Sequence, residues 1–374
     1  MPVEGYLSGN GDAQEALVVV FLRGGADGLS LVVPLEDDEY YNARPRLAVT
    51  KSRAIRLDDF FGLNPLLREL DPLYREGALA IVHGAGSEDT SRSHFEAQDF
   101  MEHGGVVAGG WLGRFLRYRP EAKGGALSAI SVGKEVPECL RGAPSATVLQ
   151  SIQDFSFGAG STALVGELER LYLAQEDTLS MAARDTLRAL RRIETLRKTP
   201  YQPEHGMEYP ADAFAQGLAQ IARLIKARVG LEAASIDLDG WDSHFTQGSI
   251  IDPLMTRLAG GLAAFHRDLG KMMERVTVVA MTEFGRRVGE NASFGTDHGR
   301  GSVMFVMGGG VKGGRVFGSW PGLKTDVLEG PGDLPVFNNY RNVLAPVLER
   351  YGAGDQMAMI FPEFTVEPLS LYSA

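Results

Sequence analysis

The chain contains a single cysteine, Cys139, among its 374 residues. One thiol cannot form a disulfide framework, and it cannot supply the several thiolates of a structural zinc site. Cys139 lies in the segment VPECLRGAP, which contains no histidine that would activate a thiolate. We therefore expect an inert thiol at this position and look for chemistry among the carboxylates, histidines and hydroxyls.

Positive charge is also scarce, with 37 lysine and arginine residues against 48 acidic residues and a net charge of −11. Binding to the phosphates of a nucleic acid requires a basic face, so this composition argues against a nucleic-acid partner. A small anionic substrate is still compatible with it, because bound metal ions would supply the local positive charge.

Long hydrophobic runs are missing as well. No stretch reaches the roughly 18 apolar residues that a membrane-spanning helix needs. The N-terminal segment MPVEGYLSGNGDAQEA has neither the basic start nor the apolar centre of a signal peptide. We therefore expect no membrane span and see no export signal, whereas the compartment and the oligomeric state stay open.

Short apolar runs recur along the chain, and their β-branched residues predict buried strands of a parallel sheet. These runs are Ala16–Leu22, Leu79–Val82, Ala126–Val132, Leu231–Leu238, Val276–Met281 and Ser302–Met307. Helical patterns separate many of them, at Pro65–Glu76, Leu164–Leu196, Ala211–Arg228, Pro253–Met272 and Tyr340–Tyr351. The alternation predicts an α/β fold of three layers, α/β/α, with a mostly parallel sheet. We expect a flexible lead over residues 1–14 and one domain over residues 15–374.

Ionisable and hydroxyl side chains follow or precede these runs at the ends of the strands. In open α/β sheets, ligands bind at the edge where the carboxyl ends of the strands meet. Any one of these residues alone would be explained as a polar loop residue that caps a helix or turns the chain. Together they predict a functional site. The residues are Asp27, Ser93, His94, Asp242, His244, Glu283, Arg286 and His298.

Two of these segments allow a more specific interpretation. Asp242 and His244 are two residues apart, so in extended backbone both side chains point to the same side and can reach one divalent ion. Ser93 and Glu96 have the spacing of a capping box, which would explain Ser93 without any chemistry. A serine at a helix N-terminus is also well placed to act on an anion held by the free amides and the helix dipole.

The order of these residues resembles the alkaline-phosphatase superfamily, which includes sulfatases and cofactor-independent phosphoglycerate mutases. More closely, the chain resembles a bacterial branch of that superfamily, the domain-of-unknown-function family 1501. The resemblance covers nearly the whole chain and implies an alkaline-phosphatase-like fold. It is carried by the segments FLRGGADGLSLVVP, IVHGAG, RSHFEAQDFME, GWLGRFL, DGWDSH, TEFGRRVGEN and GTDHGRG.

The chain departs from the superfamily pattern at Phe284, which stands where the Asp-His-Gly motif of the superfamily has a metal-binding histidine. One metal position has therefore lost a ligand, and the sequence leaves open whether His94 replaces it. Members of this branch commonly carry a twin-arginine export signal, which this chain lacks, so the resemblance does not decide the compartment.

On this resemblance we expect a metal-dependent hydrolase of phosphate or sulfate esters, acting on a small anionic ester. It would use one or two divalent ions, Zn²⁺, Mn²⁺, Mg²⁺ or Ca²⁺. Asp242, His244 and His298 would hold the first ion. Asp27 and Glu283 would hold a second and weaker one.

Among the catalytic residues, Ser93 is the expected nucleophile, activated by metal coordination, with His94 beside it. Arg286, with Arg23 as a second candidate, would bind the oxyanion through paired N–H groups. The alternative is a catalytically silent binding or assembly protein on the same fold with at most one structural metal. Phe284 favours the alternative, whereas the retained aspartates, histidines and glutamate favour the enzyme.

Overall fold

The structure is a computed structural model and describes residues 15–120, 124–153, 166–168, 170–172 and 177–373. The predicted lead over residues 1–14 lies outside these residues, as does part of the predicted helix Leu164–Leu196. One domain over residues 15–374 therefore stays a prediction.

A nine-stranded sheet forms the centre of the described chain, in the order β11-β5-β10-β9-β1-β8-β6-β7, with β12 paired to β5. All pairs are parallel except those of β10, which runs antiparallel to β5 and β9. The prediction of a mostly parallel sheet is confirmed. Its strands are β1 (Ala16–Arg23), β5 (Leu79–Gly86), β6 (Ala129–Val132), β7 (Thr147–Leu149), β8 (Ala233–Asp239), β9 (Val276–Met281), β10 (Ser302–Gly308), β11 (Arg315–Phe317) and β12 (Asn338–Asn339).

The sheet is apolar on both faces, as β1 shows most clearly. Val18, Val20 and Leu22 belong to one buried core, and the alternate residues Leu17 and Val19 belong to another. Successive side chains of a strand point to opposite faces, so a strand covered on both sides must be apolar at every position. This is why the sequence shows continuous apolar runs here rather than alternating ones.

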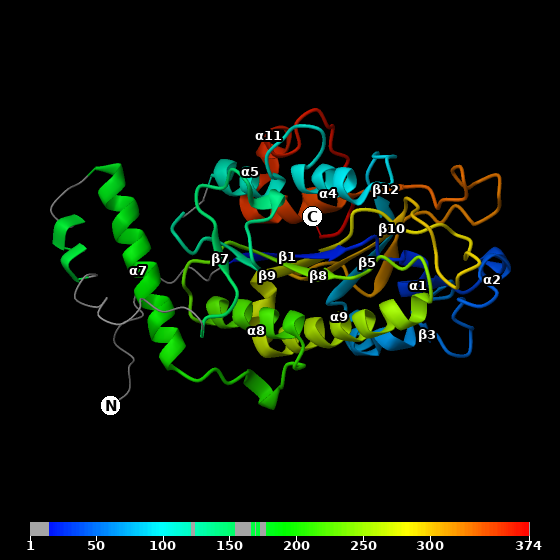
Figure 1. The fold of residues 1–374 in the computed structure, drawn as a ribbon, viewed down its shortest axis with the longest axis horizontal. Helices are drawn as coiled ribbons and strands as arrows, with labels where there is room; N and C mark the ends of the chain where they lie inside the picture. Colours follow the sequence, from blue (N-terminus) through cyan, green and yellow to red (C-terminus); the bar gives the residue numbers. More distant parts are fainter. Residues whose placement is uncertain (1–14, 121–123, 154–165, 169, 173–176, 374) are drawn as a thin grey trace.

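Helices cover both faces and give the predicted three layers (Figure 1). One face packs against α4 (His94–His103), α5 (Trp111–Tyr118), α10 (Tyr340–Leu348) and α11 (Met357–Ile360). The other packs against α8 (Ala213–Lys226), α9 (Gln247–Leu269), the 3₁₀ helix η1 (Pro65–Leu70) and α3 (Asp71–Arg75). The remaining elements are α1 (Gly28–Leu31), α2 (Asp38–Ala43), α7 (Thr178–Lys198), the short helices η2 (Glu138–Leu140), η3 (Glu204–Gly206), η4 (Gly270–Arg275), η5 (Glu349–Ala353) and η6 (Gly354–Gln356), and a small sheet of β2 (Val32–Pro34), β3 (Ile55–Arg56) and β4 (Phe61–Leu63).

Helix α9 begins earlier than predicted. The predicted helix began at Pro253. The helix begins at Gln247 instead and carries Pro253 inside it. A proline there removes one backbone hydrogen bond without preventing the flanking residues from staying helical.

The strand register brings the predicted site segments to one edge of the sheet. Arg23 at the end of β1 pairs with Asp239 at the end of β8. Strand β9 runs parallel to β1, so it ends at the same edge. Strand β10 is antiparallel, and its first residue, Ser302, pairs with Ala85 near the end of β5. The loops after β1, β5, β8 and β9 and the loop before β10 therefore meet there.

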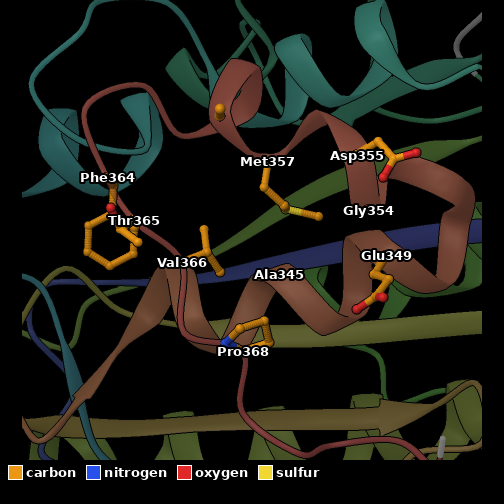
Figure 2. A pocket seen from close by; sticks show the side chains of 10 residues that line it. Ala345, Glu349, Gly354, Asp355, Met357, Phe364, Thr365, Val366 and Pro368 are labelled. Atoms are coloured by element: carbon orange, nitrogen blue, oxygen red, sulfur yellow. The ribbon is translucent and has the colours of Figure 1, made fainter.

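An open hollow lies elsewhere, beside the C-terminal segment (Figure 2). Met357, Phe364 and Val366 line it together with the carboxylates of Glu349 and Asp355. None of its lining residues belongs to the strand-end loops, so the hollow is separate from the predicted site. Within the described part of the chain, no helix combines the length and the apolar character that a membrane crossing requires.

Candidate metal site

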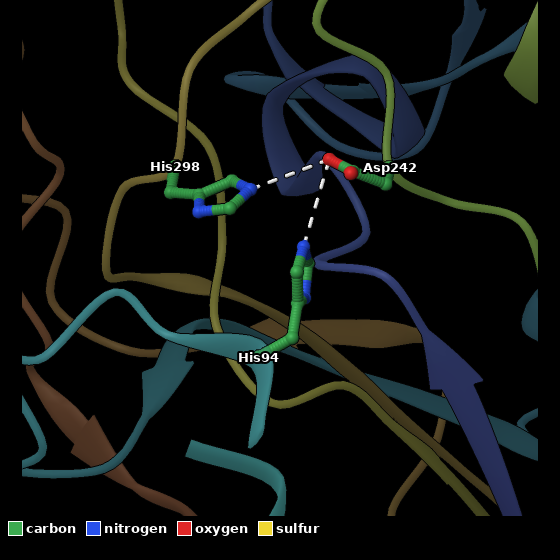
Figure 3. Close-up of side chains that lie close together, drawn as sticks. All are labelled: His94, Asp242 and His298. Carbon is green, nitrogen blue, oxygen red and sulfur yellow. Dashed lines mark hydrogen bonds and ion pairs between the residues drawn. The ribbon is translucent and has the colours of Figure 1, made fainter. Parts of the chain in front are cut away.

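Three side chains from distant parts of the chain meet at this edge: His94, Asp242 and His298 (Figure 3). One ligand atom from each lies within 4.8 Å of the other two. Asp242 Oδ1 is 3.6 Å from His94 Nε2 and 3.3 Å from His298 Nε2. His94 opens α4, Asp242 follows β8 and His298 precedes β10, so the sheet edge itself brings them together.

His244 lies beside this group at its more exposed side. Its Nε2 atom is 3.2 Å from Asp242 Oδ1 and 2.9 Å from His298 Nε2, and 39% of its side chain is exposed. The predicted neighbours Asp242, His244 and His298 thus lie close together. What the sequence left open is the place of His94, which joins them.

All three imidazoles are held by their Nδ1 atoms, while their Nε2 atoms turn toward Asp242. The partner of each Nδ1 is a carboxylate or a carbonyl oxygen, and such an oxygen only accepts hydrogen bonds. Each Nδ1 therefore carries a proton and donates it to its partner, as the non-ligating nitrogen does in metal-binding histidines, and Nε2 is the nitrogen that faces the space beside Asp242. The three contacts are His94 with Glu283 Oε1 at 2.8 Å, His244 with Asp297 Oδ1 at 3.2 Å and His298 with the Arg92 carbonyl at 2.8 Å.

One further observation indicates that these residues fit a divalent ion. The Nε2 atom of His94 is buried and has no hydrogen-bond partner. Its distance of 3.6 Å to Asp242 Oδ1 is too long for a hydrogen bond. Two ligand atoms about 2.0–2.1 Å from one zinc ion at a tetrahedral angle lie about 3.4 Å apart. The separation between His94 and Asp242 therefore suits two ligands of one ion.

The electrostatics of the site favour metal-competent protonation states at Asp242 and His298, whereas an ion at His94 would compete with a proton. Partial burial alone would raise the pKa of Asp242, but the hydrogen bond and charge of Arg286 lower it to about 2. Burial lowers the pKa of His298. The hydrogen bond with Glu283 raises the pKa of His94. Near neutral pH, Asp242 is therefore anionic and His298 neutral, which are the states that bind metal.

Glu283, predicted as a metal ligand, lies behind His94. Its buried Oε1 accepts hydrogen bonds from His94, from the Gly24 amide at 2.9 Å and from Gln98 at 2.9 Å. Burial would raise the pKa of Glu283, but these hydrogen bonds, led by that of His94, lower it. The carboxylate thus fixes the orientation of His94.

Asp27, the other half of the predicted second metal site, is bound elsewhere. Its two oxygens accept hydrogen bonds from Arg44, at 2.6 and 3.0 Å. Ser30 and Gln247 donate to it as well. Burial would raise the pKa of Asp27, but the charge of Arg44 lowers it. Asp27 is therefore one partner of a buried ion pair with Arg44. Its contacts and those of Glu283 do not form a shared metal site.

Arg286 is buried, and its guanidinium forms hydrogen bonds with several groups of the protein. It donates to Asp242 Oδ1 at 2.7 Å, to the Gly25 carbonyl at 2.8 Å and to the Thr296 carbonyl at 3.1 Å, and it also donates to the carbonyl of Gly24. A guanidinium held in this way is not free to contact an ester, so Arg286 serves Asp242 instead of the predicted oxyanion.

Arg23, the second candidate for the oxyanion, is paired as well. Its guanidinium lies 2.6 Å from Asp237 and 2.7 Å from Glu102. The nearby thiol of Cys139 is buried, and burial raises its pKa well above the ordinary value, in agreement with an inert thiol.

The capping box predicted at Ser93 is wrong. Ser93 is the N-cap residue of α4, but its side chain makes no cap hydrogen bond. Its amide donates to Ser91 Oγ at 3.2 Å rather than to Glu96, so neither half of the reciprocal pair forms. Ser93 is half-buried and directly precedes His94, and its hydroxyl is not used to cap the helix.

Phe284 lies against two of the candidate ligands. Its ring centre is 4.9 Å from that of His94 and 4.8 Å from that of His298. The position where the resemblance expects a ligand thus holds an aromatic support, and His94 supplies an imidazole from another element. No motif in the sequence marks the Arg92 carbonyl or Gln98 as hydrogen-bond partners in this site. Asp297 was visible only as part of the Asp-His-Gly segment.

A family model described as a protein of unknown function, DUF1501, matches residues 77–347. The chain belongs to this family. Its match covers Ser93, His94, Asp242, His244, Glu283 and His298. None of the curated proteins matches the chain in sequence.

Among solved structures, the chain is similar to the C-terminal periplasmic domain of EcEptC from Escherichia coli in complex with Zn, at 10% identity, 80% and 73% coverage of the two chains and a TM-score of 0.37. It is also similar to the PsFucS1 sulfatase from Pseudoalteromonas sp., at 12% identity, 87% and 70% coverage and a TM-score of 0.35. Likenesses this distant carry no argument about this chain.

Metal binding tests the ligand set. We expect His94→Ala, Asp242→Asn and His298→Ala to abolish the binding of one equivalent of Zn²⁺ or Mn²⁺, measured by calorimetry and metal analysis. Glu283→Gln should weaken binding about 10- to 100-fold, because it loosens His94. His244→Ala should weaken binding without abolishing it.

The exposed His205 offers a matched control, since it lies in η3 and should be neutral when replaced by alanine. Full stoichiometry in His94→Ala, with loss in His244→Ala, would contradict this ligand set in favour of Asp242, His244 and His298.

The buried ion pair gives a stability prediction. Arg44→Met should cost about 3–5 kcal/mol in the free energy of unfolding, because it leaves the Asp27 carboxylate buried and unpaired. As a control, Arg46→Met removes an ion pair of the half-exposed Arg46 and should cost at most about 1 kcal/mol.

The pH dependence of that cost has a defined sign. In the wild type the folded pKa of Asp27 is lowered, so the pair contributes fully above the unfolded value of about 3.9 and is lost as the pH falls through the folded pKa. In Arg44→Met, burial alone raises the pKa of Asp27, so protonation relieves the penalty. The cost of the substitution should shrink as the pH falls from about 7 to about 4. A cost independent of pH would contradict this.

Proposed function

We propose that the chain is a metal-dependent hydrolase of phosphate or sulfate esters that uses one divalent ion, and an alkaline-phosphatase-like relationship is part of this proposal. His94, Asp242 and His298 would hold the ion. The unpartnered, buried Nε2 atom of His94, facing an ionised carboxylate and a second imidazole, is the observation that carries the proposal.

The donor set narrows the choice of ion. Among the expected ions, imidazole nitrogen suits Zn²⁺ best, whereas Mn²⁺, Mg²⁺ and Ca²⁺ favour oxygen ligands. Three protein ligands, such as two imidazoles and one carboxylate, are typical of catalytic zinc, which keeps a fourth position for water or substrate. When bound, such an ion would supply Lewis acidity beside the ester oxygens.

The chain itself contributes orientation. Glu283 keeps the proton of His94 on Nδ1, and the Arg92 carbonyl does the same for His298. Arg286 keeps Asp242 ionised and in place. Ser93 is the proposed nucleophile, because it precedes His94 directly and its hydroxyl is not used as a cap.

One observation favours the second candidate function, a binding or assembly protein with a single structural metal. Both arginines expected at the oxyanion, Arg23 and Arg286, are paired within the protein. Stabilisation of the developing charge would then depend on the ion and on backbone amides alone.

A hydrolysis panel decides between the two. We expect aryl phosphate mono- or diesters or aryl sulfates to be hydrolysed by protein loaded with Zn²⁺ or Mn²⁺, and a chelator to abolish the turnover. Silence across the panel in folded, metal-loaded protein would favour the binding protein. Turnover that survives the chelator in metal-free protein would contradict the mechanism.

The Ser93→Ala variant separates chemistry from capping. Its rate should fall by about three orders of magnitude or more if Ser93 is the nucleophile. Its free energy of unfolding should change by less than the 1 kcal/mol or so of a working cap, because no cap hydrogen bond is lost. Ser52→Ala is the control, at an exposed serine whose hydroxyl bonds that of Thr50. Unchanged turnover in Ser93→Ala would remove Ser93 from the mechanism.

A further inference from the structure

Three phenylalanines are strongly exposed in the described part of the chain: Phe95 in the first turn of α4, Phe245 in the loop after β8 and Phe294 in the loop before β10. Phe95 is 85% exposed, Phe245 61% and Phe294 49%. Phe95 directly follows His94, and Phe245 directly follows His244. Scattered exposed apolar residues are ordinary, but rings placed next to candidate site residues are not scattered.

Phe294 belongs to the same rim through the backbone. Its carbonyl accepts a hydrogen bond from the Gln247 amide at 2.8 Å, and the Ser293 carbonyl accepts one from the Thr246 amide at 2.9 Å. The loop before His298 is thereby fastened to the segment that carries His244 and Phe245. Phe245 and Phe294 thus lie on two loops that are hydrogen-bonded to each other, and one of these loops carries the partly exposed His244.

The backbone is strained to present one of these rings. Phe294 has a φ of +60°, in the left-handed region that bulky side chains avoid. The strain does not serve burial, since the ring remains half exposed with the Arg46 guanidinium 4.1 Å from its centre. Strained residues held at a surface beside a site are frequently part of ligand binding.

The arginines around the site do not offer an alternative way of binding a substrate through its charge. The arginines of the surrounding loops are each paired with a carboxylate: Arg23 with Asp237, Arg46 with Glu290, Arg92 with Asp333, Arg286 with Asp242, Arg287 with Asp297 and Arg300 with Glu329. A polyanionic sugar chain would need free cations around the site. Apolar rings instead suit an ester with one anionic head and an apolar remainder.

We propose that Phe95, Phe245 and Phe294 bind the apolar part of the ester, a ring-sized group such as an aryl, while its anionic head lies at the metal. The proposal rests on the proposed function and deepens it by naming the substrate class. An aryl group would pack against these rings in offset-stacked or edge-to-face geometry.

Binding and kinetics test this together. Metal-loaded protein should bind phenylphosphonate at least about 10-fold more tightly than methylphosphonate, and Phe245→Ser should remove most of that difference. For a hydrolysed phenyl ester, Phe245→Ser should raise KM about 10-fold and leave kcat unchanged, because the ring contact is equal in ground and transition states. Met359→Ser, at an exposed apolar residue of α11, is the control.

Equal affinity for the two phosphonates, or a KM of a phenyl ester that Phe245→Ser leaves unchanged, would overturn the proposal. So would a dimer that buries these rings, seen by light scattering and lost in Phe245→Ser. Failure of hydrolysis with a retained phosphonate preference would instead overturn only the hydrolase function, so the two failures are distinguishable.

Discussion

The site depends on one buried cation, the guanidinium of Arg286. It donates to carbonyls of the loops that follow β1 and precede β10 and to the carboxylate of Asp242, which follows β8. An arginine this deeply buried needs acceptors on all sides, so these loops must converge on it. Asp242 is consequently held ionised with one oxygen facing the histidines. The guanidinium makes the shortest recorded contact of the Asp242 carboxylate, at 2.7 Å.

A second constraint acts on the imidazoles. Glu283, Asp297 and the Arg92 carbonyl each accept a hydrogen bond from an Nδ1 atom, which turns the three Nε2 atoms toward the space beside Asp242. In a protein without a ligand there, this arrangement leaves His94 Nε2 buried and unsatisfied. Buried polar atoms without partners are rare in folded proteins and call for an explanation. A divalent ion supplies one.

The sheet and its ligand edge could be read from the sequence, because continuous apolar runs such as Val276–Met281 leave few alternatives to buried strands. The residues that gather at the edge followed from the same reading. Their partners did not. Asp27 forms an ion pair with Arg44, and Arg286 forms one with Asp242. Both pairs join different loops of the folded chain, so no spacing in the sequence predicts them. The place of His94 depended likewise on Glu283, far away in the chain.

The central claim is that one ion binds between His94, Asp242 and His298. The most direct test is a crystal structure of the zinc-loaded protein with an anomalous difference map at the zinc edge. The account predicts one strong peak within bonding distance of the Nε2 atoms of His94 and His298 and of an oxygen of Asp242. A peak between Asp27 and Glu283, a peak that excludes His94, or no peak in fully loaded crystals would contradict it.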